Sequence, residues 1–557
     1  MSSSLSFQGL STGLQTDAIV NAILQQEGQP VQRMLAQQAK NTQRIGAFQA
    51  MQSNLTALSS SLSTLSGTSF AAQTVTSSDS TNTYVTATAT GATVGNYGLN
   101  VSQIATAGRI SPTLSGGAPT NLAVADPLAT TIFTGTSASF AIQGTDGVIK
   151  TLTLDSGSNN LYGLRDAINA SGASVQASVV NTGSGANPYQ LVVTATGTGT
   201  GTTNGVVSLA DVTSGGAVNT LGITAGTVDS MTTPTTLTGG LQSATADVAK
   251  NAIFSVNGIQ LTRQTNVVSD AVSGITFTLK QGGQTGTTNL AVATDTSTIT
   301  SAMQDVISKY NALVTAFTSA SASGGALYGD SVARSLISQV RTALTAVPSG
   351  LPLTSTYTSA GGVGVKVNQD GTLSLDTTAF QAALAKDPTA VKNVFAFSGT
   401  SSSAAVQFYG AGANTTTGTV GFNITSYVPN GAVSGTFTVN GTNYTLNGNA
   451  GILVGAAGTP LDGLILTASG VGSGSLTLSR GVGQAVQDLV TNLTAAVSGQ
   501  LPQIIQSVND QNSSLAQQIS AGQDRLAQRK KVLQAQFAQM EAVVGQLQSA
   551  GASLTGM

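Results

Sequence analysis

The sequence predicts an α+β multidomain protein, in which helical coiled-coil termini and a helical bundle domain carry nested β-rich insertion domains. Three observations predict this fold. The chain has 557 residues, which is too long for a single hydrophobic core, since domains usually hold about 100–200 residues. Apolar residues at both ends recur at steps of three and four, which is typical of amphipathic helices. Between the ends, short runs rich in Val and Thr alternate with Gly-containing turns, which is typical of strands.

The N-terminal segment, residues 1–66, is predicted to supply terminal helices and bundle helices. Thr16 or Asp17 can cap a first helix, which Gly28 and Pro30 then break. A second helix follows, and Gly67 is a suitable residue to end it. Its apolar side chains form one stripe because they lie three or four residues apart. The residues predicted to pack along this helix seam, and through it in assembly, are Ile45, Phe48, Leu55 and Leu62.

The C-terminal segment, residues 481–557, is predicted to mirror this pattern with bundle helices and a coiled-coil leg. The seam along its last helix has one break in register. Its members are Leu515, Ile519, Leu526 and Leu533, and after the break Phe537, Met540, Val544 and Leu547. Each stripe must bury its apolar face, either in an intramolecular hairpin between the two ends or against other subunits. Either arrangement brings the two ends of the chain together.

The middle of the chain is predicted to consist of β domains and a second helical region. Strands with Asp-Gly or Asn-Gly turns are expected at 138–155 and 252–280, and a short helix at 161–171. The predicted domains are a first β part at 67–115, an inserted outer β domain at 116–245, a second β part at 246–295, a helical bundle domain with a β-hairpin at 296–400, and a Gly-rich β insertion at 401–480.

The composition excludes several kinds of site. The chain has no Cys and no His, which rules out disulfides, His–Cys zinc centres and triads with a His base. Its only glutamates are Glu27 and Glu541, so Glu-based acid–base pairs are missing. We therefore expect no enzyme activity, no cofactor and no metal. A net charge of −2 predicts no nucleic-acid binding, and no apolar run approaches the ~20 residues that a membrane span requires. The N-terminus also lacks the features of a cleavable secretion signal.

Three short motifs resemble chemical sites but are better explained by local structure. Asn368, Asp370 and Gly371 have the spacing of part of a calcium loop, yet the bidentate Glu is missing, so a hairpin turn is predicted. The Gly-rich stretch at 197–205 lacks the Lys of a phosphate loop and is expected to be a flexible tip. Asp330 or Ser331 is expected to cap a helix rather than to take part in catalysis.

The opening stretch GLSTGLQTDAIVNAIL (9–24) closely resembles the start of the flagellar hook-associated protein 2 family, the filament cap proteins. The stretch at 153–181 resembles a small β module of flagellar hook-associated proteins, and those at 364–395 and 528–554 resemble the family's C-terminal region. The resemblance spans nearly the whole chain and is weakest near 110–135, 205–250 and 401–480. The residues that match the family's opening box are Gly9, Leu10, Thr12, Gly13, Leu14, Thr16 and Asp17.

This resemblance implies a structural function outside the cell. It implies export, in an unfolded state, through the flagellar type III apparatus with the help of an export chaperone, which explains the lack of a cleaved signal. It further implies that several copies form a homo-oligomeric cap at the distal end of the filament, next to flagellin and the hook–filament junction proteins. The terminal helices would act as legs, while exported flagellin is retained, folded and inserted beneath the cap.

Three other functions are compatible with parts of the sequence. A flagellin or a hook–filament junction protein would also pair terminal helices, but the opening box and the QRKKVLQAQF segment favour the cap. An adhesin could use the outer β domain at 116–245 to bind a host or other surface, alone or as a second role. An enzyme displayed on the β domains is disfavoured because His and Cys are absent and Glu is scarce.

Overall fold

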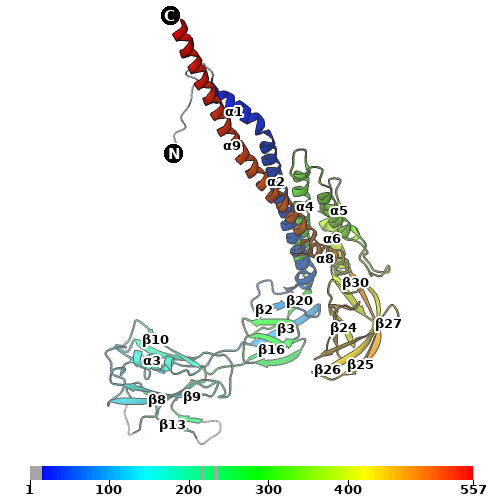
Figure 1. Ribbon diagram of the computed structural model, residues 1–557. Helices are drawn as coiled ribbons and strands as arrows, with labels where there is room; N and C mark the ends of the chain where they lie inside the picture. The colour runs from blue at the N-terminus through cyan, green and yellow to red at the C-terminus, as the bar shows by residue number, and fades with distance from the viewer. Residues whose placement is uncertain (1–14, 215–218, 231–235, 556–557) are drawn as a thin grey trace. The chain divides into compact units, whose positions relative to one another are not determined.

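The computed structural model describes residues 15–214, 219–230 and 236–555, and it divides into two compact units. The first unit combines both ends of the chain, up to Phe70 and from Thr296 onward, and the second unit is Ala71–Asp295. Helices and β-sheets occur in both units (Figure 1). The predicted α+β class is therefore confirmed.

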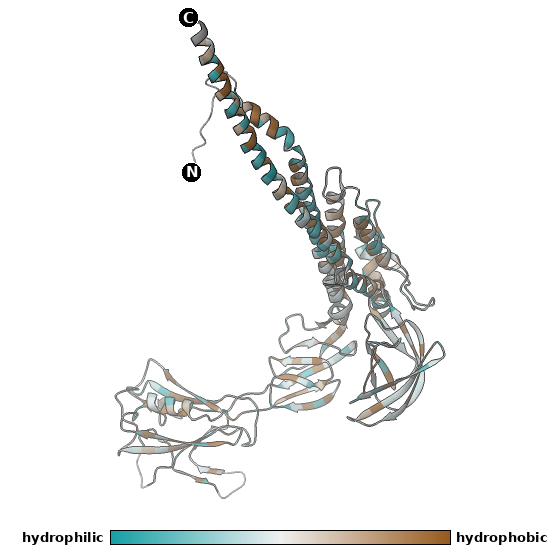
Figure 2. Cartoon of the chain, in the orientation of Figure 1, coloured by the Kyte–Doolittle hydropathy of each residue, from teal (hydrophilic) through white to brown (hydrophobic). Residues whose placement is uncertain are grey.

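Long helices form both ends of the first unit, and α9 runs beside α1 and α2 (Figure 1). Hydrophobic residues recur along these helices among hydrophilic ones (Figure 2). This alternation is expected of helices that bury one stripe and expose the rest to solvent. The elements are α1 (Thr16–Glu27), α2 (Gln29–Thr64), the π-helical turn η1 (Leu65–Ser69) and α9 (Gln500–Thr555).

The predicted cap of the first helix is wrong by one residue. The carbonyl oxygen of Gln15 accepts hydrogen bonds from the N–H groups of Ala18 and Ile19, at 3.0 and 3.1 Å. Gln15 therefore occupies the capping position, and Thr16 and Asp17 lie in the first turn of α1. An acidic residue in the first turn still interacts favourably with the helix dipole, which accounts for an Asp at this place.

The predicted helix breakers act only weakly. Gly28 keeps a right-handed helical conformation and donates to the Leu24 carbonyl oxygen at 2.8 Å, so α1 and α2 are separated by one residue. Pro30 lies in the first turn of α2, where its missing N–H has no helical partner to lose. Gly67 does not end α2, because the chain continues as a π-helical turn through Ser69.

The body of the first unit is a helical domain around one large core. The second half of α2 supplies Phe48, Met51, Leu55 and Leu58 to this core, all buried. Asp330 caps α5 by accepting hydrogen bonds from two backbone N–H groups, which confirms the predicted cap. The other elements are α4 (Thr296–Ser321), α5 (Ser331–Thr345), η2 (Gly361–Val363), β21 (Val365–Val367), β22 (Leu373–Leu375), α6 (Thr377–Lys386), α7 (Pro388–Phe395) and α8 (Val482–Thr494).

An eight-stranded antiparallel sheet is inserted between α7 and α8. Its two outermost strands approach each other, and the rings of Phe397 and Phe408 stack with centroids 5.7 Å apart. The sheet begins at Phe397, so the predicted boundary at 401 lies too late in the sequence. In spatial order the strands are β23 (Phe397–Ser401), β30 (Gly472–Arg480), β25 (Gly418–Tyr427), β26 (Ala432–Val439), β27 (Thr442–Asn449), β28 (Ile452–Val454), β29 (Ile465–Ala468) and β24 (Val406–Gly410).

The inner part of the second unit consists of two sheets around a common apolar core. Asn257 and Gly258 both have positive φ, as a tight turn between two strands requires, and they join β16 to β17 as predicted. The five-stranded sheet contains β1 (Gln73–Ser77), β20 (Thr288–Thr294), β3 (Gly95–Gln103), β16 (Ala252–Val256) and β17 (Ile259–Arg263). The three-stranded sheet contains β18 (Val267–Val272), β19 (Ile275–Leu279) and β2 (Val85–Ala89).

The outer part of the second unit has its own core, which already includes Ile110. The predicted boundary at 116 is therefore too late, because β4 pairs with β11. Four short strands form two hairpins, β5 (Leu114–Ser115) with β6 (Ala118–Pro119) and β13 (Gly226–Asp229) with β14 (Thr236–Gly239). The other elements are β4 (Arg109–Ile110), β7 (Ala123–Val124), β8 (Ser137–Gln143), β9 (Ile149–Asp155), α3 (Leu161–Ala170), β10 (Val175–Asn181), β11 (Tyr189–Ala195), β12 (Ser208–Asp211) and β15 (Leu241–Gln242).

The stretch at 197–205 is a packed loop, so the prediction of a flexible tip is wrong. Its glycines approach other backbone segments closely. A Cβ atom on Gly201 would lie 1.9 Å from the carbonyl oxygen of Thr145, and one on Gly205 would lie 2.4 Å from that of Ala249. Both glycines also have positive φ. Glycine is needed at both positions because the loop packs where no side chain fits. Phosphate binding is not required to explain these glycines.

We expect Gly201→Ala to destabilise the second unit, because the new methyl group collides with backbone at an unfavourable φ. The expected loss is roughly 1–3 kcal/mol, or more if the loop separates from its neighbours. Calorimetry of the full chain measures it as a lower unfolding temperature. Gly197→Ala in the same loop is the matched control, because no atom lies within 4 Å of its added Cβ. Equal effects of the two variants would contradict the packed loop.

Candidate assembly surface on the terminal helices

The ends of the chain meet in an antiparallel helical hairpin. Gly522 of α9 faces α2, and a Cβ atom there would lie 2.7 Å from Cγ2 of Val31. Near Gly28 the packing is less tight, since a Cβ atom there would lie at an ordinary contact distance of 3.6 Å from Cδ1 of Leu526. The missing side chain at Gly522 lets the two helix backbones come close together. The structure thus uses the hairpin, one of the two arrangements that the apolar stripes allowed.

An ion pair fixes the same register. The guanidinium Nε of Arg529 lies 3.2 Å from Oε1 of Glu27. Both side chains are partly exposed, so the pair adds little to stability, and its main effect is to favour one alignment of α1 against α9. Glu27 is one of only two glutamates in the sequence.

A polar layer separates the hairpin from the helical core. Asn41 is 5% exposed, and its Oδ1 accepts a hydrogen bond from Gln37 at 3.1 Å. Across the pair, Asn512 Nδ2 lies 3.5 Å from the Thr42 hydroxyl, and Gln38 Nε2 lies 3.5 Å from the Asn512 carbonyl oxygen. Asn512 Oδ1 is buried and has no partner among the described residues. Buried polar residues in paired helices specify register at a cost in stability.

The predicted seam residues fall into four groups. Phe48, Leu55 and Leu62 are buried in the helical core of their own chain. Ile519 and Leu533 are buried in the hairpin, each 6% exposed. The half-buried residues are Ile45, Leu515, Leu526, Phe537 and Val544, and the exposed ones are Met540 and Leu547.

The end of α9 presents apolar side chains to solvent. Met540 is 37% exposed, Val543 53% and Leu547 66%. The helix α9 extends past the start of α1 (Figure 1). The predicted seam included Met540, Val544 and Leu547 but missed Val543. The steps of three and four from Met540 to Val543 and Leu547 would have indicated a second apolar stripe.

The first helix carries a second apolar strip of its own. A shallow hollow of about 510 Å³ is lined by Ile19, Ala22 and Ile23, together with Gln26 and Glu27. Of the predicted opening box, Thr16 is buried and Asp17 is exposed. The box residues Gly9, Leu10, Thr12, Gly13 and Leu14 lie outside the described residues.

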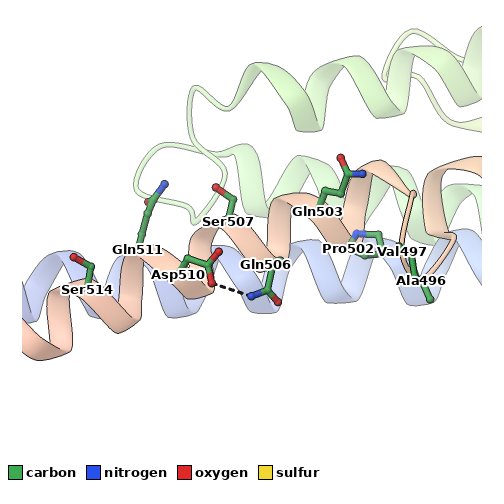
Figure 3. Close-up of a pocket in the computed structure, with 9 residues that line it drawn as sticks. All are labelled: Ala496, Val497, Pro502, Gln503, Gln506, Ser507, Asp510, Gln511 and Ser514. Atoms are coloured by element: carbon green, nitrogen blue, oxygen red, sulfur yellow. Dashed lines mark hydrogen bonds between the residues drawn. The ribbon is translucent and has the colours of Figure 1, made fainter.

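The start of α9 carries mainly polar side chains. A hollow of about 720 Å³ lies beside Gln503, Gln506, Asp510 and Ser514 (Figure 3). Gln506 Nε2 donates to Asp510 Oδ1 at 2.8 Å, so one amide and one carboxylate satisfy each other. A hollow of this kind fits a polar protein surface better than a reacting small molecule.

The calcium-loop motif is a hairpin turn, as predicted. Asp370 lies between β21 and β22 and accepts hydrogen bonds from the Thr372 hydroxyl at 2.6 Å and from its N–H at 3.0 Å. The first of these bonds is the main cause of the lowered pKa of Asp370. Over the described ranges, no three acidic side chains cluster as a metal site would require.

Membrane-spanning features were sought in the same part of the chain. Within residues 15–214, 219–230 and 236–555, no helix combines the length and the hydrophobicity of a transmembrane span.

The two ends of the sequence match models of one protein family. The model for the N-terminus of flagellar hook-associated protein 2 matches residues 12–108, and the model for its C-terminus matches residues 249–549. The matched ranges include both legs of the hairpin and leave residues 109–248 between them.

Curated relatives agree with this assignment. Flagellar hook-associated protein 2 of Escherichia coli K12 is 28% identical over 402 residues, which cover 70% of this chain and 79% of the relative. The B-type protein of Pseudomonas aeruginosa PAO1 is 29% identical over 405 residues, with 70% and 80% covered. Among solved structures, domains D1–D3 of the E. coli flagellar cap protein match with a TM-score of 0.48 and 28% identity, over 62% of this chain and 89% of that one.

A helical hairpin built from both ends, with apolar side chains exposed at its tip, is suited to a structural protein that works by association. The chain belongs to the flagellar hook-associated protein 2 family. Its members are structural proteins that cap the flagellar filament, so this protein is a filament cap protein that associates with copies of itself and with the filament at its extracellular tip.

We expect Gly522→Leu to separate α9 from α2 near Val31, because the hairpin has no room for a side chain there. Overpacking of this kind costs about 1–3 kcal/mol. Amide hydrogen exchange should therefore speed up about tenfold or more in α1 and the facing part of α9, with little change in the helical core.

Ala521→Leu is the matched control for this experiment. Its side chain is exposed on the neighbouring position of the same helix, so it adds the same atoms without entering the interface. Unchanged exchange in Gly522→Leu would mean that the two helices are not tightly packed in solution.

Proposed function

We propose that the protein forms a homo-oligomeric cap that retains exported flagellin at the filament tip and promotes its folding and insertion. The observation that carries this proposal is the exposed apolar end of α9, where Met540, Val543 and Leu547 are accessible beside a half-buried stripe. Such a surface is suited to packing against another helix and to releasing it again, since only a few side chains are involved.

The hairpin is the element that would dock. None of residues 534–552 toward its tip is buried, whereas the helical core buries large side chains. Local opening therefore costs less at the tip than in the body. A leg of this kind can detach from one filament subunit and rebind to the next without unfolding the rest of the chain.

The remaining partners follow from the same function. We infer that the chain reaches the tip unfolded, through the flagellar type III export apparatus and with an export chaperone, and then contacts the hook–filament junction proteins before flagellin arrives. A sequence without Cys and with 8% charged residues is compatible with this route. We also infer a purely structural role without catalysis, supported by the family and by the lack of His and Cys.

Deletion of the gene in the bacterium that encodes it tests the capping function. We expect hooks without filaments in electron micrographs and monomeric flagellin in the medium, with both defects reversed by the intact gene. Normal filaments without flagellin leakage would overturn the proposal and favour another role at the surface.

A charged substitution in the exposed apolar stripe at the end of α9 tests whether this helix is the docking surface. We expect Leu547→Asp to reduce filament number and to increase flagellin leakage, because a carboxylate cannot be buried cheaply in an apolar contact. Gln546→Asp, on the adjacent exposed position, is the control and should keep normal filaments. Equal amounts of each variant must reach the medium, which an immunoblot measures. Normal filaments with Leu547→Asp would exclude the α9 end as the docking surface.

A further inference from the structure

The helical domain contains an apolar cavity that no side chain fills. Its volume is about 220 Å³, and aliphatic and aromatic side chains from several helices form its walls. The deep wall includes Leu62, Met303 and Phe395, all buried. Val367, which is 49% exposed, marks the side that opens to solvent. Most of the wall residues are aliphatic or aromatic and offer water few hydrogen bonds, so the cavity favours an apolar group.

A single leucine projects from the loop that borders this cavity. Leu353 is 92% exposed, the highest value among the large hydrophobic residues of the described chain. The loop begins after Thr345 and ends at Ser359, and both of these residues line the cavity. Full exposure of an aliphatic side chain in a rigid turn is unfavourable for an isolated subunit, and it suits a side chain that inserts into a partner.

The loop holds Leu353 in a fixed position. The Ser355 N–H donates to the Pro352 carbonyl oxygen at 3.0 Å, which places Leu353 at the corner of a tight turn. On one side of the turn, the Ser349 carbonyl oxygen accepts from the Arg480 N–H at 2.8 Å. On the other side, the Thr356 hydroxyl donates to Asp387 at 3.2 Å. Together with the turn, these anchors on both sides restrict the movement of Leu353.

We propose that Leu353 of one copy of this chain inserts into the apolar cavity of a second copy, and that this contact joins neighbouring subunits of the cap. The proposal rests on the self-association described above and names the surfaces that carry it. An aliphatic side chain matches the cavity in chemistry and is small enough to enter it. The anchors at Ser349 and Thr356 keep Leu353 from folding back into its own cavity, so the insertion is between copies.

The form of the contact fits an assembly of several copies. A projecting side chain and a cavity are different surfaces, so each subunit can use both at once, one toward each neighbour. Contacts of this heterologous kind close into rings when the rotation between copies allows it. The turn also reduces the entropy lost on association, because Leu353 is already held in place before it binds.

Introduced cysteines test the contact directly, because the natural chain has none. Purified Leu353→Cys chains are mixed with size-tagged Val367→Cys chains and oxidised. We expect disulfide-linked pairs of one tagged and one untagged chain to form. The control replaces Leu353→Cys by Val497→Cys, since Val497 is 88% exposed and thus close to Leu353 in exposure. Linkage with Leu353→Cys should be roughly tenfold faster than with this control. Equal rates would overturn the proposal. An internally linked monomer from the double variant, in place of linked pairs, would also overturn it, in favour of a strap within one chain.

A charge at the same position gives an independent readout. In sedimentation experiments, Leu353→Asp should raise the concentration needed for half-association about tenfold or more, while Val497→Asp leaves it unchanged. Both residues are exposed, so both variants are expected to keep the unfolding temperature of the natural chain. Unchanged association of Leu353→Asp overturns this contact alone. The capping function is tested separately, by the filament count after gene deletion.

Discussion

The antiparallel contact between α2 and α9 is the constraint on which the rest of the fold depends. It joins residues such as Thr42 and Asn512, which are 470 positions apart in the sequence. Everything between them must leave the hairpin and return to it, which is why the β domains occur as insertions. The entropy cost of closing such a loop grows only with the logarithm of its length, by about 0.6 kcal/mol per doubling. An inserted sheet such as the one that begins at Phe397 therefore adds little to the cost of bringing the ends together.

The same contact produces a gradient of stability along the hairpin. At its base, α2 buries Phe48 and Leu58 completely among the helices of the core. The layer around Asn41 then exchanges apolar burial for hydrogen bonds, whose net contribution is only about 1 kcal/mol each. Beyond it, the hairpin buries only a few large side chains, such as Ile519 and Leu533, beside the close packing at Gly522. A leg that is firm at its base and loosely held at its tip is what repeated docking requires.

The sequence predicted what periodicity and turn chemistry encode. The stripes through Phe48 and Ile519, the cap at Asp330 and the hairpin turn at Asp370 all depend on neighbours within a few residues, and all were placed correctly. The errors concern interactions over longer distances. Gly201 gave the pattern of a flexible tip, because the Thr145 backbone that packs on it comes from a different strand connection. Tertiary packing can therefore turn a glycine-rich stretch into a packed loop although the local sequence indicates a flexible one.

The residues of the candidate site also differ in whether local sequence spacing or only tertiary structure reveals them. Leu547 was predicted from its spacing, but its exposure follows from where the partner helix begins, which periodicity does not record. Leu353 and the cavity were invisible for a stronger reason: a cavity is a property of walls from several helices, while an exposed leucine in a loop has no pattern at all. Only 8% of the residues are charged, and Asp462 is the single charged residue between positions 401 and 479. The chain therefore has few charges with which to select partners. Shape has to supply that selectivity, so recognition in this protein depends on where apolar groups project and where they are missing.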